Sequence, residues 1–126
     1  MDNQLWLVGL GGFLGAISRY FLNQYFSEIK LFPLGTFLVN MTGSFFMGLL
    51  LGSNWISDNI LLLVGTGYLG AYTTFSTFNV ELLIFKKNKQ EFQFFLYVIS
   101  SYIFGILLAY LGYFITTNIR HNTSLL

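Results

Sequence analysis

Cysteine is absent from this chain of 126 residues, and proline, histidine and charged residues are all scarce. The lack of cysteine excludes disulfides, thiolate metal sites and cysteine nucleophiles. Charged residues make up 9% of the sequence, against about 25% in a soluble domain, whereas hydrophobic residues make up 55%. The net charge of +1 gives no reason to expect a nucleic-acid partner. The sequence therefore predicts a membrane protein.

An enzyme is the class of protein that these residues support least. No histidine falls within an apolar run, and no serine has a general base within reach in the sequence. Neither a phosphate-binding loop nor the spacing of a metal-ligand motif occurs. We therefore expect no catalytic residues.

Apolar runs divide the chain into four segments, each long enough to cross a bilayer, which takes about 20 residues. We expect spans at about 5–26, 34–56, 60–85 and 92–119, in a single transmembrane domain over 1–126. The first residues lack the basic stretch of a cleaved signal peptide, so we expect the first span to be retained. Pro33 fits the first turn of the second span, where a missing N–H is harmless. The expected fold is an all-α membrane protein with four transmembrane helices.

Small residues mark the faces where we expect helices to meet. Gly11 and Gly15 form a GxxxG pair in the first span, which lets another helix approach closely. In the second span Asn40, Gly43 and Ser44 share one helical face. That face is small and polar, so it suits a helix contact or a cavity better than lipid.

The third span carries a polar cluster that hydrocarbon would not tolerate without partners. Residues 70–81 include five hydroxyl side chains, two phenylalanines and a carboxylate. A polar cluster at membrane depth indicates a functional site, although the hydroxyls could also bond back to helix carbonyls. Gly70, directly before the hydroxyls, predicts that the third helix is broken there in mid-membrane, with its backbone facing protein or a wet cavity.

Several of these side chains have a structural interpretation beside the functional one. Arg19 either extends its charge to the interface, pairs with Glu81, or adds positive field to an anion path. Asn40 either joins two helices or lines a pore. Phe75 and Phe78 either pack, or turn their positive ring edges into a pore where an anion is held weakly and leaves quickly. Glu81 itself either carries protons, pairs with a cation, or accepts N–H groups near the break.

Three motifs in order along the chain resemble the CrcB/Fluc family of small fluoride channels. They are GGFLGAISRY at 11–20, PLGTFLVNMTGSF at 33–45 and GAYTTFSTFNVE at 70–81. The resemblance implies an antiparallel dimer in the bacterial cell membrane, with two pores at the interface between its subunits. It also implies that the protein exports toxic fluoride passively, as a channel.

The resemblance implies roles for individual residues in the pore. Asn40 would offer its amide N–H to the ion in the entry vestibule, where Arg19 would add positive field. Phe75 and Phe78 would line the pore with their ring edges. The polar constriction around these rings would comprise Ser76, Thr77 and Glu81.

The same resemblance implies a structural sodium ion at the centre of the dimer. The backbone carbonyls of Gly70 and Thr73, from both subunits, would hold it. Unwound carbonyls are a known way to hold sodium at mid-membrane.

The fourth span departs from the family pattern. The family has hydroxyl-bearing residues there at four-residue spacing, whereas the same row in this chain reads Tyr97, Ser101, Gly105 and Ala109. Tyr97 and Ser101 would serve the pore. Gly105 and Ala109 instead predict a close packing face. Because Gly105 and Ala109 have no hydroxyl, a pore along this face need not conduct as well as one with the complete family pattern.

Lysine and arginine are distributed unequally between the two sides of the membrane. The side of the first and third loops carries Lys30, Lys86, Lys87 and Lys89, and the other side carries Arg120 alone. The positive-inside rule then favours both termini outside. A subunit that inserts both ways should have almost no bias. The chain therefore either pairs in a fixed orientation with a related chain of opposite bias, or forms a homodimer whose lysines do not fix its topology.

Two other functions compete with a fluoride channel. A proton-coupled small multidrug transporter also has four spans, but it needs a carboxylate midway along the first span, and no acidic residue lies between Leu5 and Phe26. The other is a non-conducting accessory subunit of a membrane complex, which predicts no ion flux.

Overall fold

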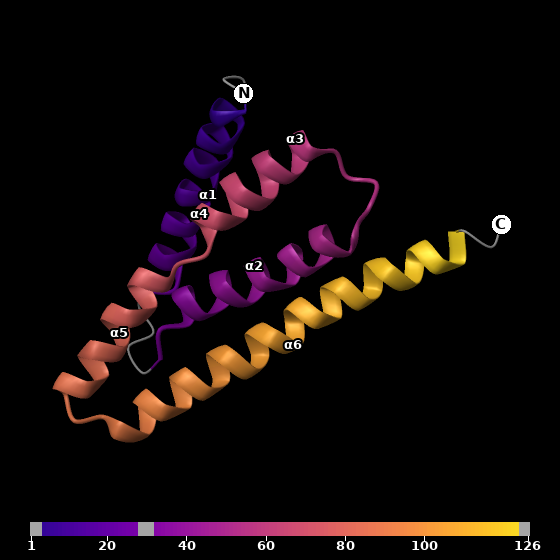
Figure 1. The fold of residues 1–126 in the computed structure, drawn as a ribbon. Coiled ribbons are helices and arrows are strands. Elements are labelled where there is room, and N and C mark those ends of the chain that lie inside the picture. Colours follow the sequence, from indigo (N-terminus) through magenta and orange to yellow (C-terminus); the bar gives the residue numbers. More distant parts are fainter. Residues whose placement is uncertain (1–3, 28–31, 124–126) are drawn as a thin grey trace.

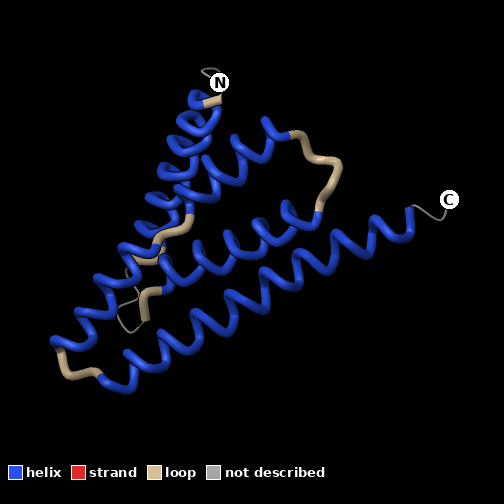
Figure 2. The backbone as a smooth tube through the Cα atoms, viewed as in Figure 1, coloured by secondary structure: helices blue, strands red, loops and turns tan. Residues whose placement is uncertain are grey.

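The computed structural model describes residues 4–27 and 32–123, with side chains described as far as Ile119. Within these ranges all regular structure is helical, which confirms the predicted all-α fold (Figure 2). The elements are α1 (Leu5–Tyr25), α2 (Leu34–Gly52), α3 (Asp58–Ile60), η1 (Leu61–Leu69), α4 (Gly70–Tyr72), α5 (Phe75–Lys87) and α6 (Glu91–Thr123). Lys30 and the side chain of Arg120, which enter the charge argument, lie outside the described part.

Three of the described helices are long and apolar enough to cross a membrane. They are Leu5–Tyr25, Leu34–Gly52 and the Glu91–Ile119 part of α6, and they correspond to the expected first, second and fourth spans. The stretch expected as the third span consists of α3, η1, α4 and α5 in succession. Its first long piece, η1, is π-helical, a wider coil that is rare and often lies near functional sites.

The second helix is shorter than expected, since it ends at Gly52 rather than near Ile56. The Ser53 hydroxyl donates to the carbonyl of Leu49 at 2.8 Å, and the Ser53 N–H donates to the carbonyl of Leu50 at 3.1 Å. These two bonds satisfy carbonyls that a further helical turn would otherwise use. Ser53 itself is extended, with a ψ angle of 113°, and the helix ends before it.

The helices associate mainly in two groups (Figure 1). The long α6 lies along α2, and α1 lies against η1 and α4. From the end of α4, α5 leads toward the start of α6 and contacts it. Two small buried clusters hold these groups together, one around Val39 and Tyr72, the other around Phe78 and Tyr97.

Glycine permits both of the close helix contacts. A Cβ on Gly15 would collide with the carbonyl of Tyr68, and one on Gly11 would likewise meet the backbone of η1. This confirms that the GxxxG pair admits another helix. In the other group, a Cβ on Gly48 would collide with the carbonyl of Ala109. Membrane helices, which gain little from burying large apolar side chains, associate through such close backbone contact.

The helical course is interrupted between α4 and α5, where Thr73 and Thr74 are extended with ψ angles of 155° and 120°. The expectation that Gly70 marks the break is wrong in its position. Gly70 has helical angles, φ −61° and ψ −38°, and opens α4. Glycine permits a break but does not require one, and the contacts described next locate it three residues later.

Candidate functional site

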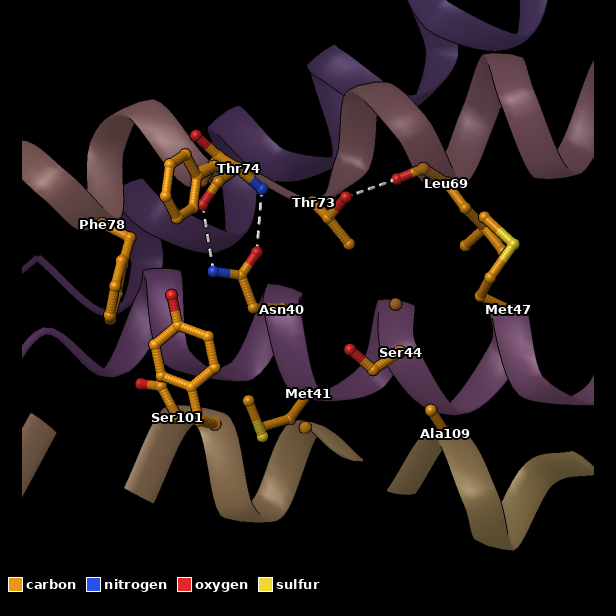
Figure 3. A pocket seen from close by; sticks show the side chains of 14 residues that line it. Asn40, Met41, Ser44, Met47, Leu69, Thr73, Thr74, Phe78, Ser101 and Ala109 are labelled. Carbon is orange, nitrogen blue, oxygen red and sulfur yellow. Dashed lines mark hydrogen bonds between the residues drawn. The ribbon is translucent and has the colours of Figure 1, made fainter. Parts of the chain in front are cut away.

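A cavity of about 390 Å³ lies between α2, the interruption, α5 and α6, and Figure 3 shows the side chains around it. Most of its wall is apolar. The predicted polar face of α2 borders it through Asn40, Gly43 and Ser44, as expected of a face that suits a cavity. The other polar residues of its lining are Thr73, Thr74, Ser101 and Tyr102.

Asn40 binds both backbone groups of Thr74, from a position 34 residues earlier in the chain (Figure 3). The Thr74 N–H donates to Asn40 Oδ1 at 2.8 Å, and Asn40 Nδ2 donates to the Thr74 carbonyl at 3.0 Å. In a continuous helix the Thr74 N–H would instead donate to the carbonyl of Gly70. The Asn40 amide thus takes the place of helical bonding, which explains why the chain is extended at Thr74.

Arg19 reaches the same interruption from α1. Its Nη1 donates to the carbonyl of Thr73 at 3.4 Å, a long and therefore weak hydrogen bond. The alternative in which Arg19 pairs with Glu81 is wrong, because no ion pair joins them among the described residues: Arg19 bonds to Thr73, and Glu81 accepts from Thr36 and Tyr97. Each of the two extended residues is therefore tied to a neighbouring helix, Thr73 to α1 and Thr74 to α2.

Thr74 also caps the start of α5. Its Oγ1 accepts from the Thr77 N–H at 3.2 Å and donates to Thr77 Oγ1 at 3.0 Å. Ser76 is exposed, with its hydroxyl 3.3 Å from Thr74 Oγ1. Thr73 bonds back to the carbonyl of Leu69 at 2.9 Å. Of these hydroxyls only that of Thr73 bonds back to a helix carbonyl, as the structural interpretation expected, whereas those of Thr74, Ser76 and Thr77 contact one another at the start of α5.

Phe75 and Phe78 both line the cavity, but their surroundings differ. Their ring centroids lie 6.2 Å apart with 29° between the planes. Phe78 is 5% exposed and packs between Tyr97 and Tyr102, with the Tyr102 ring nearly perpendicular to it. Phe75 is 69% exposed. Of these two phenylalanine rings, one is therefore fixed by packing and one lies at the surface.

Glu81 belongs to a second cavity rather than the first. Its Oε1 accepts from the Thr36 hydroxyl at 2.7 Å, and its Oε2 accepts from the Tyr97 hydroxyl at 2.7 Å. A separate cavity of about 330 Å³ is lined by Thr36, Thr77 and Glu81 together with the start of α2. Of the predicted constriction residues, Thr77 and Glu81 thus line the second cavity and Ser76 lines neither, whereas Phe75 and Phe78 line the first.

The four residues expected to form one row along the fourth span do not all line the same cavity. Tyr97 is fully buried and directs its hydroxyl to Glu81. Ser101 borders the first cavity, and its Oγ is buried without a hydrogen-bond partner among the described residues. Gly105 and Ala109 line the same cavity, and the close contact of Ala109 with Gly48 confirms the expected packing at Ala109, whereas a Cβ on Gly105 would meet only ordinary contacts.

The CrcB family model, described as "CrcB-like protein, Camphor Resistance (CrcB)", matches residues 6–113. The chain belongs to the CrcB family. A Bacillus cereus relative named fluoride-specific ion channel FluC 2 is 45% identical over 108 residues, which cover 84% of this chain and 91% of the relative. A Ligilactobacillus salivarius relative named fluoride-specific ion channel FluC 1 is 46% identical over 106 residues, covering 83% and 92%. A Campylobacter lari relative named fluoride-specific ion channel FluC is 44% identical over 113 residues, covering 86% and 93%.

Two residues that line the cavities of this CrcB family member, Thr36 and Tyr102, were not predicted from the sequence as site residues. Thr36 was not singled out, although it lies four residues before Asn40 and therefore on the same helical face. Tyr102 follows Ser101 directly and was hidden among the many aromatic residues of α6. Helical spacing from Asn40 could have found the first, whereas nothing in the sequence distinguishes the second.

Proposed function

We propose that this chain is a passive, fluoride-selective ion channel that exports cytoplasmic fluoride across the bacterial cell membrane and so relieves its toxicity. Membership of the CrcB family, with relatives named fluoride-specific ion channels, carries the proposal. The first cavity gives it a physical basis, since it combines hydrogen-bond donors with aromatic rings in an apolar wall.

An anion in this cavity meets donors that the fold leaves unused. An asparagine amide has two N–H groups, and one of those on Asn40 donates to Thr74 while the other remains available. The Ser101 hydroxyl has no partner among the described residues. Buried donors without acceptors are unfavourable, so an ion that accepts from them is stabilised.

The charge distribution around the cavity also suits an anion. α5 begins at the interruption, and the N–H groups at its amino terminus carry the partial positive charge of the helix dipole. Its first turn contains no acidic residue that would offset this charge. The Glu81 carboxylate is held at the second cavity by Thr36 and Tyr97. The edges of Phe75 and Phe78 add weak contacts, and weak binding at several sites lets an ion leave as readily as it enters.

The functional unit in this proposal is an antiparallel dimer with pores at its interface and a third helix broken in mid-membrane. Gly70, Phe75 and Ser76 are exposed around the interruption. Backbone and hydroxyl groups that are exposed at membrane depth are unfavourable in lipid, and a second subunit would cover them.

The dimer would hold a structural sodium ion through the carbonyls of Gly70 and Thr73. The residues fit such an ion, because the Gly70 carbonyl loses its helical partner when the Thr74 N–H bonds to Asn40. Among the described residues, the Thr73 carbonyl accepts only a long bond from Arg19, which leaves it a second lone pair. Sodium would supply charge that joins the two interrupted helices at the interface.

The proposal is tested by fluoride efflux from liposomes that contain the purified chain together with any partner subunit it needs. We expect electrogenic fluoride efflux without a proton gradient, and no comparable chloride efflux. Strict dependence on a proton gradient would indicate a coupled transporter instead. Absence of flux would indicate an accessory subunit.

The identity of the second subunit is tested by its topology in the membrane. Single cysteines at Asn88, directly after α5, and at Asn122, in the last turn of α6, are unambiguous in this chain, which has no natural cysteine. The lysine bias predicts that each is labelled from one side of the membrane only, as required for pairing with a related chain of opposite bias. Labelling of both positions from both sides would indicate a homodimer of dual topology.

A further inference from the structure

The first cavity contains a second unused hydroxyl, that of Ser44 on α2. Four serine and threonine residues line this cavity: Ser44, Thr73, Thr74 and Ser101. Thr73 bonds to a helix carbonyl and Thr74 to Thr77. No hydrogen bond of Ser44 is found within the described residues, and Ser101 is also unpaired. This differs from Thr42 on the same helix, whose hydroxyl donates to the carbonyl of Leu38 at 2.7 Å.

Ser44 lies one helical turn after Asn40 and faces a position of α6 that has no side chain. In α6 the position one turn after Ser101 is Gly105, which has no side chain. A Cβ built on Gly105 would lie 3.8 Å from Ser44 Oγ and 3.5 Å from Met41 Cε. Both distances are ordinary van der Waals contacts. Ser44 therefore provides a hydroxyl at the level where α6 provides none, and Figure 3 shows it beside Met41 within the cavity.

We propose that Ser44 is an anion-binding residue of the pore, whose hydroxyl continues the series of donors begun by Asn40 and Ser101 in the part of the cavity opposite Gly105. A hydroxyl supplies one donor, and none of the residues that the structure describes accepts from that of Ser44. An anion that moves along the cavity then passes from the Asn40 amide to hydroxyls on two facing helices. The inference rests on the proposed function, because it assumes that the anion passes through this cavity.

The test measures fluoride efflux from liposomes for Ser44→Ala and for the double variant Ser44→Ala with Gly105→Ser. Losing one donor to an anion weakens binding about tenfold or more, and we expect Ser44→Ala to lower the rate of efflux by a similar factor. Gly105→Ser then replaces the hydroxyl from the opposite helix, where there is room for it, and should restore most of the rate.

Two controls separate the hydroxyl from packing. Gly105→Ala in the Ser44→Ala background adds the same Cβ without the hydroxyl and should restore nothing. Ser100→Ala removes a hydroxyl that donates to the carbonyl of Tyr97, outside the cavity lining, and should conduct like the wild type. Ser44→Cys, which keeps the volume but donates weakly, should lower the rate and provides a second variant if Ser44→Ala fails to fold.

Efflux of Ser44→Ala and Ser44→Cys within twofold of the wild type would overturn the inference. Equal rescue by Gly105→Ala and Gly105→Ser would also overturn it, since filling space rather than donating would then explain the effect. The wild type is measured first. If it failed to conduct fluoride, the proposed function itself would be wrong, and that result is distinct from the failure of Ser44 to matter in a conducting protein.

Discussion

Replacing Asn40 by aspartate should abolish fluoride flux for two reasons, the loss of a hydrogen-bond donor and the gain of a negative charge. The substitution keeps an oxygen that can accept from the Thr74 N–H but removes the Nδ2 donor, which lies 3.0 Å from the Thr74 carbonyl. An aspartate oxygen in that place faces another oxygen. Leaving the carbonyl unsatisfied costs about 1–3 kcal/mol, so the interruption is less firmly held.

The second and larger effect of Asn40→Asp is charge. An ionised aspartate that borders the cavity repels an entering anion. At a separation of about 4 Å and an effective dielectric constant of about 20, the repulsion is about 4 kcal/mol. A factor of ten corresponds to about 1.4 kcal/mol, so this repulsion alone lowers flux about a thousandfold.

Asn40→Ala is the companion that removes the amide without adding charge. It loses the available N–H and both bonds to Thr74, so we expect a fall in flux of roughly ten- to a hundredfold, smaller than for aspartate. Both variants should unfold in detergent at lower temperature than the wild type. A fluoride electrode records efflux from liposomes with matched protein content, checked by size-exclusion chromatography.

Two results would refute this reasoning. Flux of Asn40→Asp within tenfold of the wild type would mean that no anion passes near this side chain. Equal flux of the alanine and aspartate variants would mean that charge at this position is irrelevant, and Asn40 would then act only by holding the interrupted backbone.

Three further predictions concern the rings, the second cavity and the helix contact. Phe75→Ile and Phe78→Ile keep apolar bulk but lose the ring edge, so fluoride flux should fall much more than dimer stability, and wild-type flux in both would make the rings packing residues. Thr36→Val leaves one Glu81 oxygen without its donor, and a thermal unfolding curve in detergent should reveal a loss of about 1–3 kcal/mol of stability. Gly48→Ala places a methyl group against the α6 backbone and should destabilise the fold by about 1–3 kcal/mol, measured in the same way; an unchanged curve would contradict the close contact.

Much of the helical framework could be predicted from residues close together in sequence. Composition indicated a membrane protein, because so few charged residues cannot cover a soluble domain. The GxxxG pair predicted the close approach to α1, and the spacing of Asn40 and Ser44 predicted a shared polar face. These are local properties, since helical periodicity places residues three or four apart on one side whatever the helix later contacts.

The position of the interruption was not a local property. Glycine at 70 indicated a break, yet the chain remains helical there and opens at Thr73 and Thr74. The Asn40 amide decides the position, because it projects from another helix and forms hydrogen bonds with the N–H and the carbonyl of Thr74. A hydrogen bond between residues 34 apart in the chain depends on how α2 passes the third segment, which helical periodicity does not specify.

The sequence by itself thus determined the helical class, the apolar segments and the polar cluster, because these follow from composition and spacing along the chain. Only the tertiary structure decided which polar groups remain available. Glu81 and Tyr97 bond to each other and do not line the first cavity, whereas the hydroxyls of Ser44 and Ser101, which line it, have no hydrogen-bond partner among the described residues. The physical reason is that a donor becomes free or occupied according to the acceptors that neighbouring helices bring within about 3 Å, and those neighbours are set by packing.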